Sequence, residues 1–494
     1  MRAACVLVAA AATAIAGGCA VGPDFERPLP PSIDRYSRDP LPAETVSSSV
    51  RGGDVQHFRP GQDVPERWWT LFGSRDLDDL VDQALKQSPT VQSAQAALRQ
   101  ASELLAAQRG GYFPQAQPGY SAAREKNAVQ TLSPTLASGE QYFTLHTAQV
   151  SVSYLLDVFG GTRRQVEAQQ ALTDAQRFQL EAAYITLASN VVTAAVTEGS
   201  LRAQLTTTQA IVASERQALQ ILQRQNALGA IAMTDVMAQQ ALLASSEAGL
   251  PALEKQLAQQ RHLLAVLAGR FPGDAPDASF ELGNLVLPRD LPVSVPARLV
   301  RQRPDVLAAE AQVHAASAQV GIAVANLLPQ VSLSAQLGGA ATRVQNLFSA
   351  GSTFWSGGAS LTQTLLQGGT LWHRKRAADA ALDQAGAQYR AVVLSACQQV
   401  ADTLRALELD AAGAAAAARA EQAAQESLSA MRRNVELGSV SYLALLNAEQ
   451  GYQQAVLARV QAQANRFADS AALFQALGGG WWNRPGALKA VDPA

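Results

Sequence analysis

Side chains that could perform catalysis or hold a metal ion are scattered along this sequence. Zinc sites and nucleophilic centres need histidines, cysteines or serines at particular spacings, and no such spacing occurs. The glycine-rich loops that cradle nucleotide phosphates are missing as well. The histidines are His57, His146, His262, His314 and His373. We therefore predict that the protein is not an enzyme and has no metal site.

One cysteine stands where it could be modified. Arg2 is followed by an apolar run over residues 3–15 and by Ala16-Gly17-Gly18, directly before Cys19. This pattern predicts a secretory signal peptide over residues 1–18, too short to span a bilayer as a helix. The small residues before Cys19 resemble a bacterial lipobox, in which the thiol receives a diacylglyceryl group and the peptide is cut just before it. We therefore expect lipid on Cys19, with no other cofactor.

Two neighbours of this cysteine bear on the prediction. The usual leucine three places ahead is Ala16, so the alternative is an ordinary signal peptide with an incidental cysteine. Ala20 follows, whereas an aspartate there would resemble an inner-membrane retention signal. The outer membrane is therefore the expected location. Each buried CH₂ group of the lipid would contribute about 0.8 kcal/mol to membrane binding.

The charge balance excludes a nucleic-acid partner on electrostatic grounds. Lys and Arg number 39 against 41 Asp and Glu, whereas nucleic-acid-binding proteins carry a clustered basic surface. Only 6% of the residues are aromatic and 16% are charged, and alanine, glutamine, leucine and valine dominate. Because alanine has the highest helix propensity, this composition predicts long helices that pack through small side chains.

The sequence contains the same series of predicted helices and strands twice. Sequence markers recur in the same order. Pro89 matches Pro304 and Pro114 matches Pro329, both 215 positions apart, and Leu228-Gly229 matches Leu437-Gly438 and Gly269 matches Gly478, both 209 positions apart. Several markers in one order indicate an internal duplication. Each copy is predicted to run helix, strand, strand, long helix, glycine turn, helix. The predicted divisions are a signal peptide at 1–18, a lipidated arm at 19–67, repeats at 68–285 and 286–480, and a tail at 481–494.

Each copy contains one very long predicted helix. No proline occurs over residues 135–250 or 330–484, and a helix of about 65 residues would be on the order of 100 Å long. Leu172, Ala175 and Phe178 show the three-to-four-residue spacing of packed helices, which predicts a coiled-coil-like array. In the second copy, glycines at 386 and 413 are expected to interrupt the helix.

Four segments alternate between apolar and polar residues, as strands do. The clearest runs from Gln330 to Leu337, with valine, leucine and alanine opposite serine and glutamine. Strands are expected at about 112–126, 142–156, 328–342 and 353–366. The alternation fits a barrel between lipid and water and equally a soluble sandwich. No uninterrupted apolar stretch of 18 residues follows the signal peptide, so spanning would fall to strands. Transmembrane barrels need about eight strands, so several copies would have to share one barrel.

At four places the sequence resembles the outer-membrane factors, the TolC-like ducts of tripartite efflux pumps, and within them the NodT-type lipoproteins. The stretches are Val21-Gly22-Pro23-Asp24-Phe25-Glu26-Arg27-Pro28, Trp68-Trp69 with Phe72, Arg303-Pro304-Asp305-Val306 to Leu327-Leu328-Pro329-Gln330, and Leu437-Gly438 to Leu446-Asn447-Ala448. The resemblance covers nearly the whole mature chain. It implies a mixed α and β membrane protein, a homotrimer whose four strands per protomer form a twelve-stranded β-barrel continuous with a periplasmic α-helical barrel. A periplasmic adaptor and an inner-membrane pump are the implied partners.

In this family, turns that begin at the positions of Gly229 and Gly438 close the periplasmic end. The first tip keeps the family's acidic residue, Asp235. In the second, Ala444 and Asn447 stand where some members carry acidic residues. Carboxylates would concentrate cations at the aperture, whereas amides and methyl groups would not. We therefore predict a closed end formed by Leu445, Leu446 and Asn447. The alternative is that the leucines only pack between helices.

The function that follows is passive export of small molecules through an outer-membrane channel. A duct for type I protein secretion has the same fold and stays open as an alternative. A lipid-anchored coiled-coil adaptor without a pore is the third hypothesis. The alternating strand pairs argue against an adaptor, because adaptors usually have soluble domains there.

Overall fold

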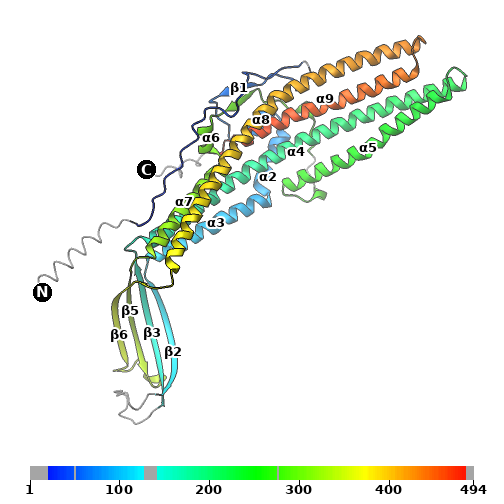
Figure 1. Ribbon diagram of the computed structural model, residues 1–494. Coiled ribbons are helices and arrows are strands. Elements are labelled where there is room, and N and C mark those ends of the chain that lie inside the picture. The colour runs from blue at the N-terminus through cyan, green and yellow to red at the C-terminus, as the bar shows by residue number, and fades with distance from the viewer. Residues whose placement is uncertain (1–19, 49, 51, 127–141, 275–277, 485–494) are drawn as a thin grey trace. The chain divides into compact units, whose positions relative to one another are not determined.

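Alternating and alanine-rich segments fold into a chain that is mostly helical with some sheet (Figure 1). The computed structural model describes residues 20–48, 50, 52–126, 142–274 and 278–484. The predicted signal peptide and Cys19 lie outside the described residues. Contacts divide the chain into two compact units. Unit 1 comprises residues 1–27, 99–175 and 309–389, and unit 2 comprises residues 28–98, 176–308 and 390–494.

The two units do not coincide with the two sequence repeats. Each unit takes residues from both copies. In unit 1 the reason is strand pairing, because β3 (Tyr142–Leu156) of the first copy pairs antiparallel with β5 (Gln330–Ala341) of the second. The duplication therefore produced two halves of one sheet rather than two separate domains.

The sheet of unit 1 has four antiparallel strands in the order β2-β3-β5-β6, seen side by side in Figure 1. The outer strands are β2 (Gln115–Lys126) and β6 (Thr353–Thr362). The first strand starts later than the expected residue 112, because Gly110–Tyr112 form a 3-10 turn. The last strand ends at Thr362 rather than near 366, where the chain leaves the sheet.

The register extends the alternation of single strands across the whole sheet. Pro118, Val150, Leu337 and Trp355 stand side by side on the four strands, and alternate residues point to the opposite face. The neighbouring row is polar and consists of Gln117, Ser151, Gln336 and Ser356. Leu337 is 66% and Trp355 80% exposed in the single chain. One face is therefore an apolar surface that the described chain leaves uncovered.

The helices of the two copies match in length. The long helices α4 (Gly161–Ala227) and α8 (Thr370–Glu436) each have 67 residues. The helices that follow the tip turns, α5 (Met233–Leu267) and α9 (Tyr442–Ala476), each have 35. The shorter helices are α2 (Arg75–Gln87), α3 (Pro89–Arg109), α6 (Pro296–Gln302) and α7 (Pro304–Ala325).

Two expectations about the long helices were wrong. The glycines at 386 and 413 do not interrupt α8, which runs through both. The cost of about 1 kcal/mol per glycine in a helix interior is too small to break a helix of this length. Leu172, expected in the packed seam, is 41% exposed, whereas Ala175 and Phe178 are buried.

Among the residues that the structure describes, one helix is long and apolar enough to span a membrane. An 18-residue window of α4 has a mean hydropathy of 1.2, although it is not an uninterrupted apolar run. Of that window, 56% is buried inside the protein. A packed core helix has the same length and composition, so this feature does not separate the two cases.

The core of unit 2 is aromatic. Trp68, which is 1% exposed, stacks on Phe474 with ring centroids 5.3 Å apart. The tail was expected to begin at residue 481. Trp481 and Trp482 are buried, however, so the packed part of unit 2 includes these two residues. The Trp481 Nε1–H donates to the Gln302 carbonyl oxygen at 2.8 Å. Burying these two large rings joins the end of the second repeat to the core.

A short parallel strand pair in unit 2 was not expected. The strand β1 (His57–Pro60), within the predicted extended arm, pairs with β4 (Asp290–Val293). Both segments have four residues and contain proline, so neither shows the alternation that predicts strands. Their pairing joins parts of the chain far apart in sequence.

Candidate functional site

The segment after the predicted lipid site is held to unit 1 by one buried arginine. Arg164, on α4, has a side chain only 4% exposed. Its Nε donates to the Val21 carbonyl oxygen at 3.2 Å, and its Nη2 donates to Asp24 Oδ1 at 2.6 Å. Its Nη1 donates to Glu167 Oε2 at 2.7 Å. Burial lowers the pKa of Arg164, but the hydrogen bonds to Asp24 and Glu167 outweigh it and raise that pKa.

Further contacts hold the same segment along α7. The Phe25 ring stacks on His314 with centroids 4.3 Å apart, and His314 Nε2 lies 3.0 Å from Glu167 Oε1. Arg27 Nε donates to Glu310 Oε1 at 2.7 Å. Residues of the motif at 21–28 thus make contacts that hold this segment to α4 and α7. Its resemblance to a family could be recognised from the residues alone, whereas its contact partners could not.

A tight backbone approach explains one glycine of this motif. Gly22 has a positive φ of 93°, and a Cβ there would collide with the Gly321 Cα of α7. The left-handed backbone and the lack of space both exclude a side chain. Residue 22 therefore has to be glycine for the segment to lie against α7.

The two tip turns have the same geometry. Gly229 has a φ of 72° and Gly438 a φ of 68°, the left-handed conformation that closes helices. Behind them, the Ala230 N–H donates to the Gln225 carbonyl and the Ser439 N–H to the Asn434 carbonyl, both at 2.9 Å. These are the hydrogen bonds of a Schellman motif. Both α4 and α8 thus end in a built turn at the residues that the sequence singled out.

The residues predicted to form the aperture differ in how deeply they are buried. Leu445 is 8% and Leu446 7% exposed, so both pack inside the protomer, which is the alternative interpretation. Asn447 is exposed and Asp235 is partly exposed. Leu443, which was not selected, is 59% exposed. Because Leu443 and Asn447 are four residues apart on α9, they share an exposed face of that helix.

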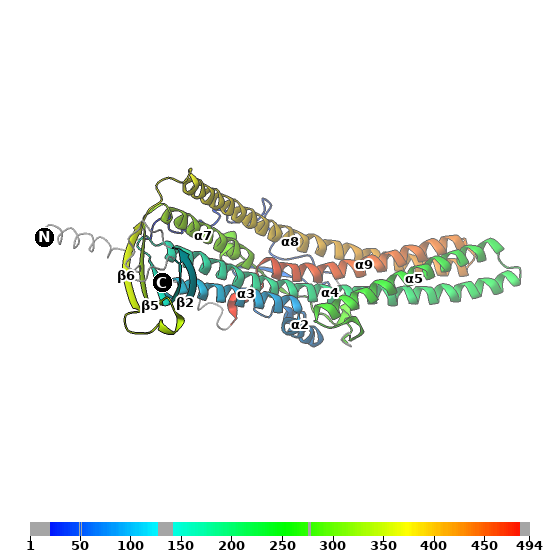
Figure 2. The same ribbon diagram turned by 90° about the horizontal axis from the view of Figure 1, so that it is seen from below.

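Near the tips, α5 packs against α9 (Figure 2), and polar contacts link these helices. The Tyr442 hydroxyl donates to Gln239 Oε1 at 3.0 Å, and Gln239 Nε2 donates to the Glu215 carbonyl at 3.1 Å. Burial raises the pKa of Tyr442 above its ordinary value, with Glu449 acting in the same direction. These residues were missed from the sequence. The sequence does place Glu449 four positions after Leu445, and this spacing puts both residues on the same buried face of α9.

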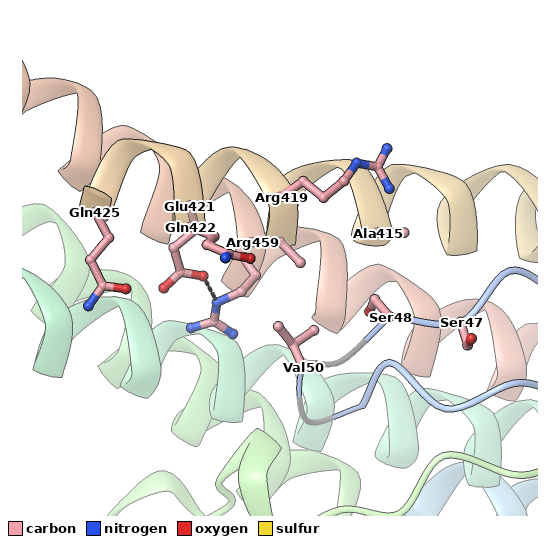
Figure 3. Close-up of a pocket in the computed structure, with 10 residues that line it drawn as sticks. Ser47, Ser48, Val50, Ala415, Arg419, Glu421, Gln422, Gln425 and Arg459 are labelled. Carbon is pink, nitrogen blue, oxygen red and sulfur yellow. Dashed lines mark ion pairs between the residues drawn. The ribbon is translucent and has the colours of Figure 1, made fainter. Parts of the chain in front are cut away.

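A second polar region joins the predicted arm to the long helices of unit 2. A cavity of about 460 Å³ is lined by Ser47, Ser48 and Val50 of the arm together with residues of α8 and α9. Figure 3 shows the ion pair between Arg459 and Glu421 beside this cavity. In the described residues, no group of three or more His, Cys, Asp or Glu could hold a metal ion.

Asp410 on α8 and Asp469 on α9 form a carboxyl pair, and we expect it to make the stability of the protein depend on pH. Burial raises the pKa of Asp469 to about 7, and the hydrogen bond to Asp410 and that residue's charge add to the effect. A raised folded-state pKa gives stability that is full below the ordinary value of 3.8 and is lost as pH rises through about 7. Discounted for partial solvent access, the loss should be roughly 1–2 kcal/mol.

We expect Asp469→Asn to remove this dependence. The variant should lose less thermal stability than the parent between pH 4 and pH 8, because the amide has no charge to bury. The unfolding midpoint followed by circular dichroism at both pH values measures it. Asp402→Asn, at an exposed position on α8, is the control. Equal pH dependence in parent and Asp469→Asn would show that the pair does not titrate in this range.

Known proteins are similar to this chain in sequence and in fold. The profile described as outer membrane efflux protein matches residues 80–270 and 295–479. A pyoverdine export outer membrane protein, OpmQ of Pseudomonas putida, is 28% identical over 419 residues, which cover 84% of this chain and 88% of the relative. Nodulation protein T of Rhizobium leguminosarum is 28% identical over 453 residues, 90% of this chain and 91% of the relative.

A solved structure agrees with these relatives. The outer-membrane channel OprN superimposes with a TM-score of 0.82 at 27% identity, covering 94% of this chain and 100% of that one. Since OpmQ is an export outer membrane protein and OprN an outer-membrane channel, the hypothesis of an adaptor without a pore is disfavoured. The aligned segments include both repeats and both tip turns. This chain belongs to the outer membrane efflux protein family, the TolC-like channels of the outer membrane.

Proposed function

We propose that this chain is one protomer of a trimeric efflux duct, and that three copies close a twelve-stranded barrel in the outer membrane. The observation that carries the proposal is the sheet of unit 1. In the described chain it has four strands, and β2 and β6 each pair on one side only. Because a transmembrane barrel must leave no open edge and needs about eight strands, the edges call for other copies.

The exposed rows of the sheet support the same proposal. The apolar row with Leu337 and Trp355 suits contact with lipid, and the polar row with Ser151 and Gln336 suits a water-filled interior. The long helices would then form the periplasmic part, and its tip would dock on a periplasmic adaptor and an inner-membrane pump. Transport through such a duct is passive and needs no cofactor of its own.

Small molecules are the proposed cargo. One relative is a pyoverdine export protein and another belongs to a toluene efflux pump. These two cargoes differ greatly in polarity and size. A duct lined by many polar side chains would accept such different cargoes more readily than one specific binding site would.

We propose that the aperture is formed by Leu443, Asn447 and Asp235, with Leu445 and Leu446 packed behind them. The purified protein in planar bilayers should give small single-channel currents, because the exposed α9 face narrows the end. Replacing Leu443 and Asn447 together by alanine should raise the conductance severalfold. Leu409→Ala, an exposed leucine in the interior of α8, is the control. Absence of current from both the parent and the tip variant would refute a duct.

The lipid anchor is a separate proposal. We infer that residues 1–18 are removed and that Cys19 carries the acyl groups. The contacts of Val21, Asp24 and Arg27, which hold the segment after Cys19 to unit 1, support this inference. Cells grown with radioactive palmitate should label the parent, and Cys19→Ser should lose the label completely. Labelling that persists in this variant would point to the ordinary signal peptide instead.

A further inference from the structure

A cavity of about 620 Å³ lies between α4, α8 and α9 in unit 2. Its lining has two kinds of side chain. Ile211, Leu428 and Val456 are apolar, whereas Glu215, Glu449 and Arg432 are charged. Pockets that combine apolar walls with a few convergent polar groups are typical binding sites for small molecules. The three helices are labelled in Figure 1.

Two of the charged groups are buried carboxylates that can accept further hydrogen bonds. Glu215 is 2% and Glu449 7% exposed. Glu215 Oε1 accepts hydrogen bonds from Gln453 Nε2 at 2.5 Å and Ser246 Oγ at 3.1 Å. Glu449 Oε1 accepts from Arg432 Nη2 at 3.3 Å. The other oxygen of each carboxylate, Oε2, is buried and has no hydrogen-bond partner in the described part of the chain.

Such oxygens are costly to leave unpaired. A buried polar atom without a partner loses its hydration and gains nothing in return. The local charge is also unbalanced, because two carboxylates and one arginine line the cavity, and the arginine side chain is 51% exposed. Burial raises the pKa of Glu449, and the charge of Glu215 raises it further while Arg432 opposes them. The missing partner is therefore a positive charge with hydrogen-bond donors.

The cavity also indicates what the positive charge is attached to. A bare metal ion would leave the apolar wall of Ile211, Leu428 and Val456 without a role. A primary ammonium group has three donors and could pair with the two carboxylates, while a hydrocarbon body would cover the wall. The Tyr452 side chain also lines the cavity and offers an aromatic surface to such a body.

We propose that this cavity binds organic amines, with the ammonium group on Glu215 and Glu449 and the apolar body against the wall of Ile211, Leu428 and Val456. All the groups come from one protomer, so the site does not depend on the proposed duct. It differs from the aperture at the tip, because its two carboxylates are buried between helices. In the detergent-solubilised full-length protein, 4-fluorobenzylamine is a suitable probe, and 4-fluorobenzyl alcohol is its neutral counterpart of similar shape.

Fluorine NMR of these two probes tests the proposal. The amine should show saturable line broadening at pH 7.5, and the alcohol should not. Glu449→Gln and Glu215→Gln should each weaken amine binding about tenfold or more, the loss expected for one charge-assisted hydrogen bond. Glu421→Gln, which removes a carboxylate from the other cavity of α8 and α9, should leave binding unchanged.

Three outcomes would overturn the proposal. They are equal broadening of amine and alcohol, amine binding that survives in Glu449→Gln, and amine binding lost to the same extent in Glu421→Gln. Circular dichroism at 222 nm checks that each variant retains its helices. If Glu215→Gln does not fold, Glu449→Gln carries the test, because the Glu449 partner Arg432 is half exposed and can turn to water.

Discussion

Arg466→Ala should release the start of β1 and the residues before it from unit 2. The Arg466 side chain is 1% exposed, and it donates to the Gly52 and Asp54 carbonyl oxygens, each at 2.9 Å, and to Gln56 Oε1 at 3.2 Å. Alanine would leave these acceptors unpaired and open a cavity. Together these effects should cost about 3–4 kcal/mol. Burial lowers the pKa of Arg466, but the loss of three acceptor contacts outweighs relief of that charge.

Hydrogen exchange measures this loss locally, without requiring reversible unfolding. Peptides covering residues 52–60 should exchange about 100-fold faster or more in the variant, the factor that corresponds to about 3 kcal/mol. Arg216→Ala is the matched control, because the Arg216–Glu247 pair is exposed on both sides and should contribute at most about 1 kcal/mol. Unchanged exchange in Arg466→Ala would mean that β1 is held by its pairing with β4 alone.

Arg164→Met should detach the segment that follows the predicted lipid site. The methylenes of methionine replace those of arginine, so the variant removes the hydrogen bonds to Val21, Asp24 and Glu167 while it keeps much of the packing. Because the Asp24 side chain is 91% exposed, its ion pair is screened by water and contributes little. The buried contacts to the Val21 carbonyl and Glu167 should account for most of a loss of about 2–3 kcal/mol.

The readout is hydrogen exchange of residues 20–27, with Arg374→Met as the control. Arg374 lies in unit 1 and is exposed, so its replacement should leave the exchange rates unchanged. Membrane attachment of the variant should persist, since the lipid is proposed to sit on Cys19 and not on the contacts of Arg164. Protection of residues 20–27 equal to that of the parent would show that the Phe25–His314 stack and the Arg27–Glu310 pair are enough.

Periodicity and glycine placement in the sequence predicted the main elements. Alternation in β3 and β5 is visible from single residues, because a strand exposed to two environments must repeat every second position. The long helices followed from the absence of proline, and the turns after them from Gly229 and Gly438, which recur at the same place in both copies. The resemblance to outer-membrane factors was confirmed by the family profile.

Contacts between distant segments were decided only by the tertiary structure. Leu443 and Leu445 have the same chemistry, and only packing against the other helices determines which of them is exposed. The same holds for Arg164, Arg466 and Glu215, since a sequence shows a charge but not whether it is buried or which carbonyl lies beside it. Local patterns repeat along the chain and can be read from it, whereas burial and partners depend on residues hundreds of positions away.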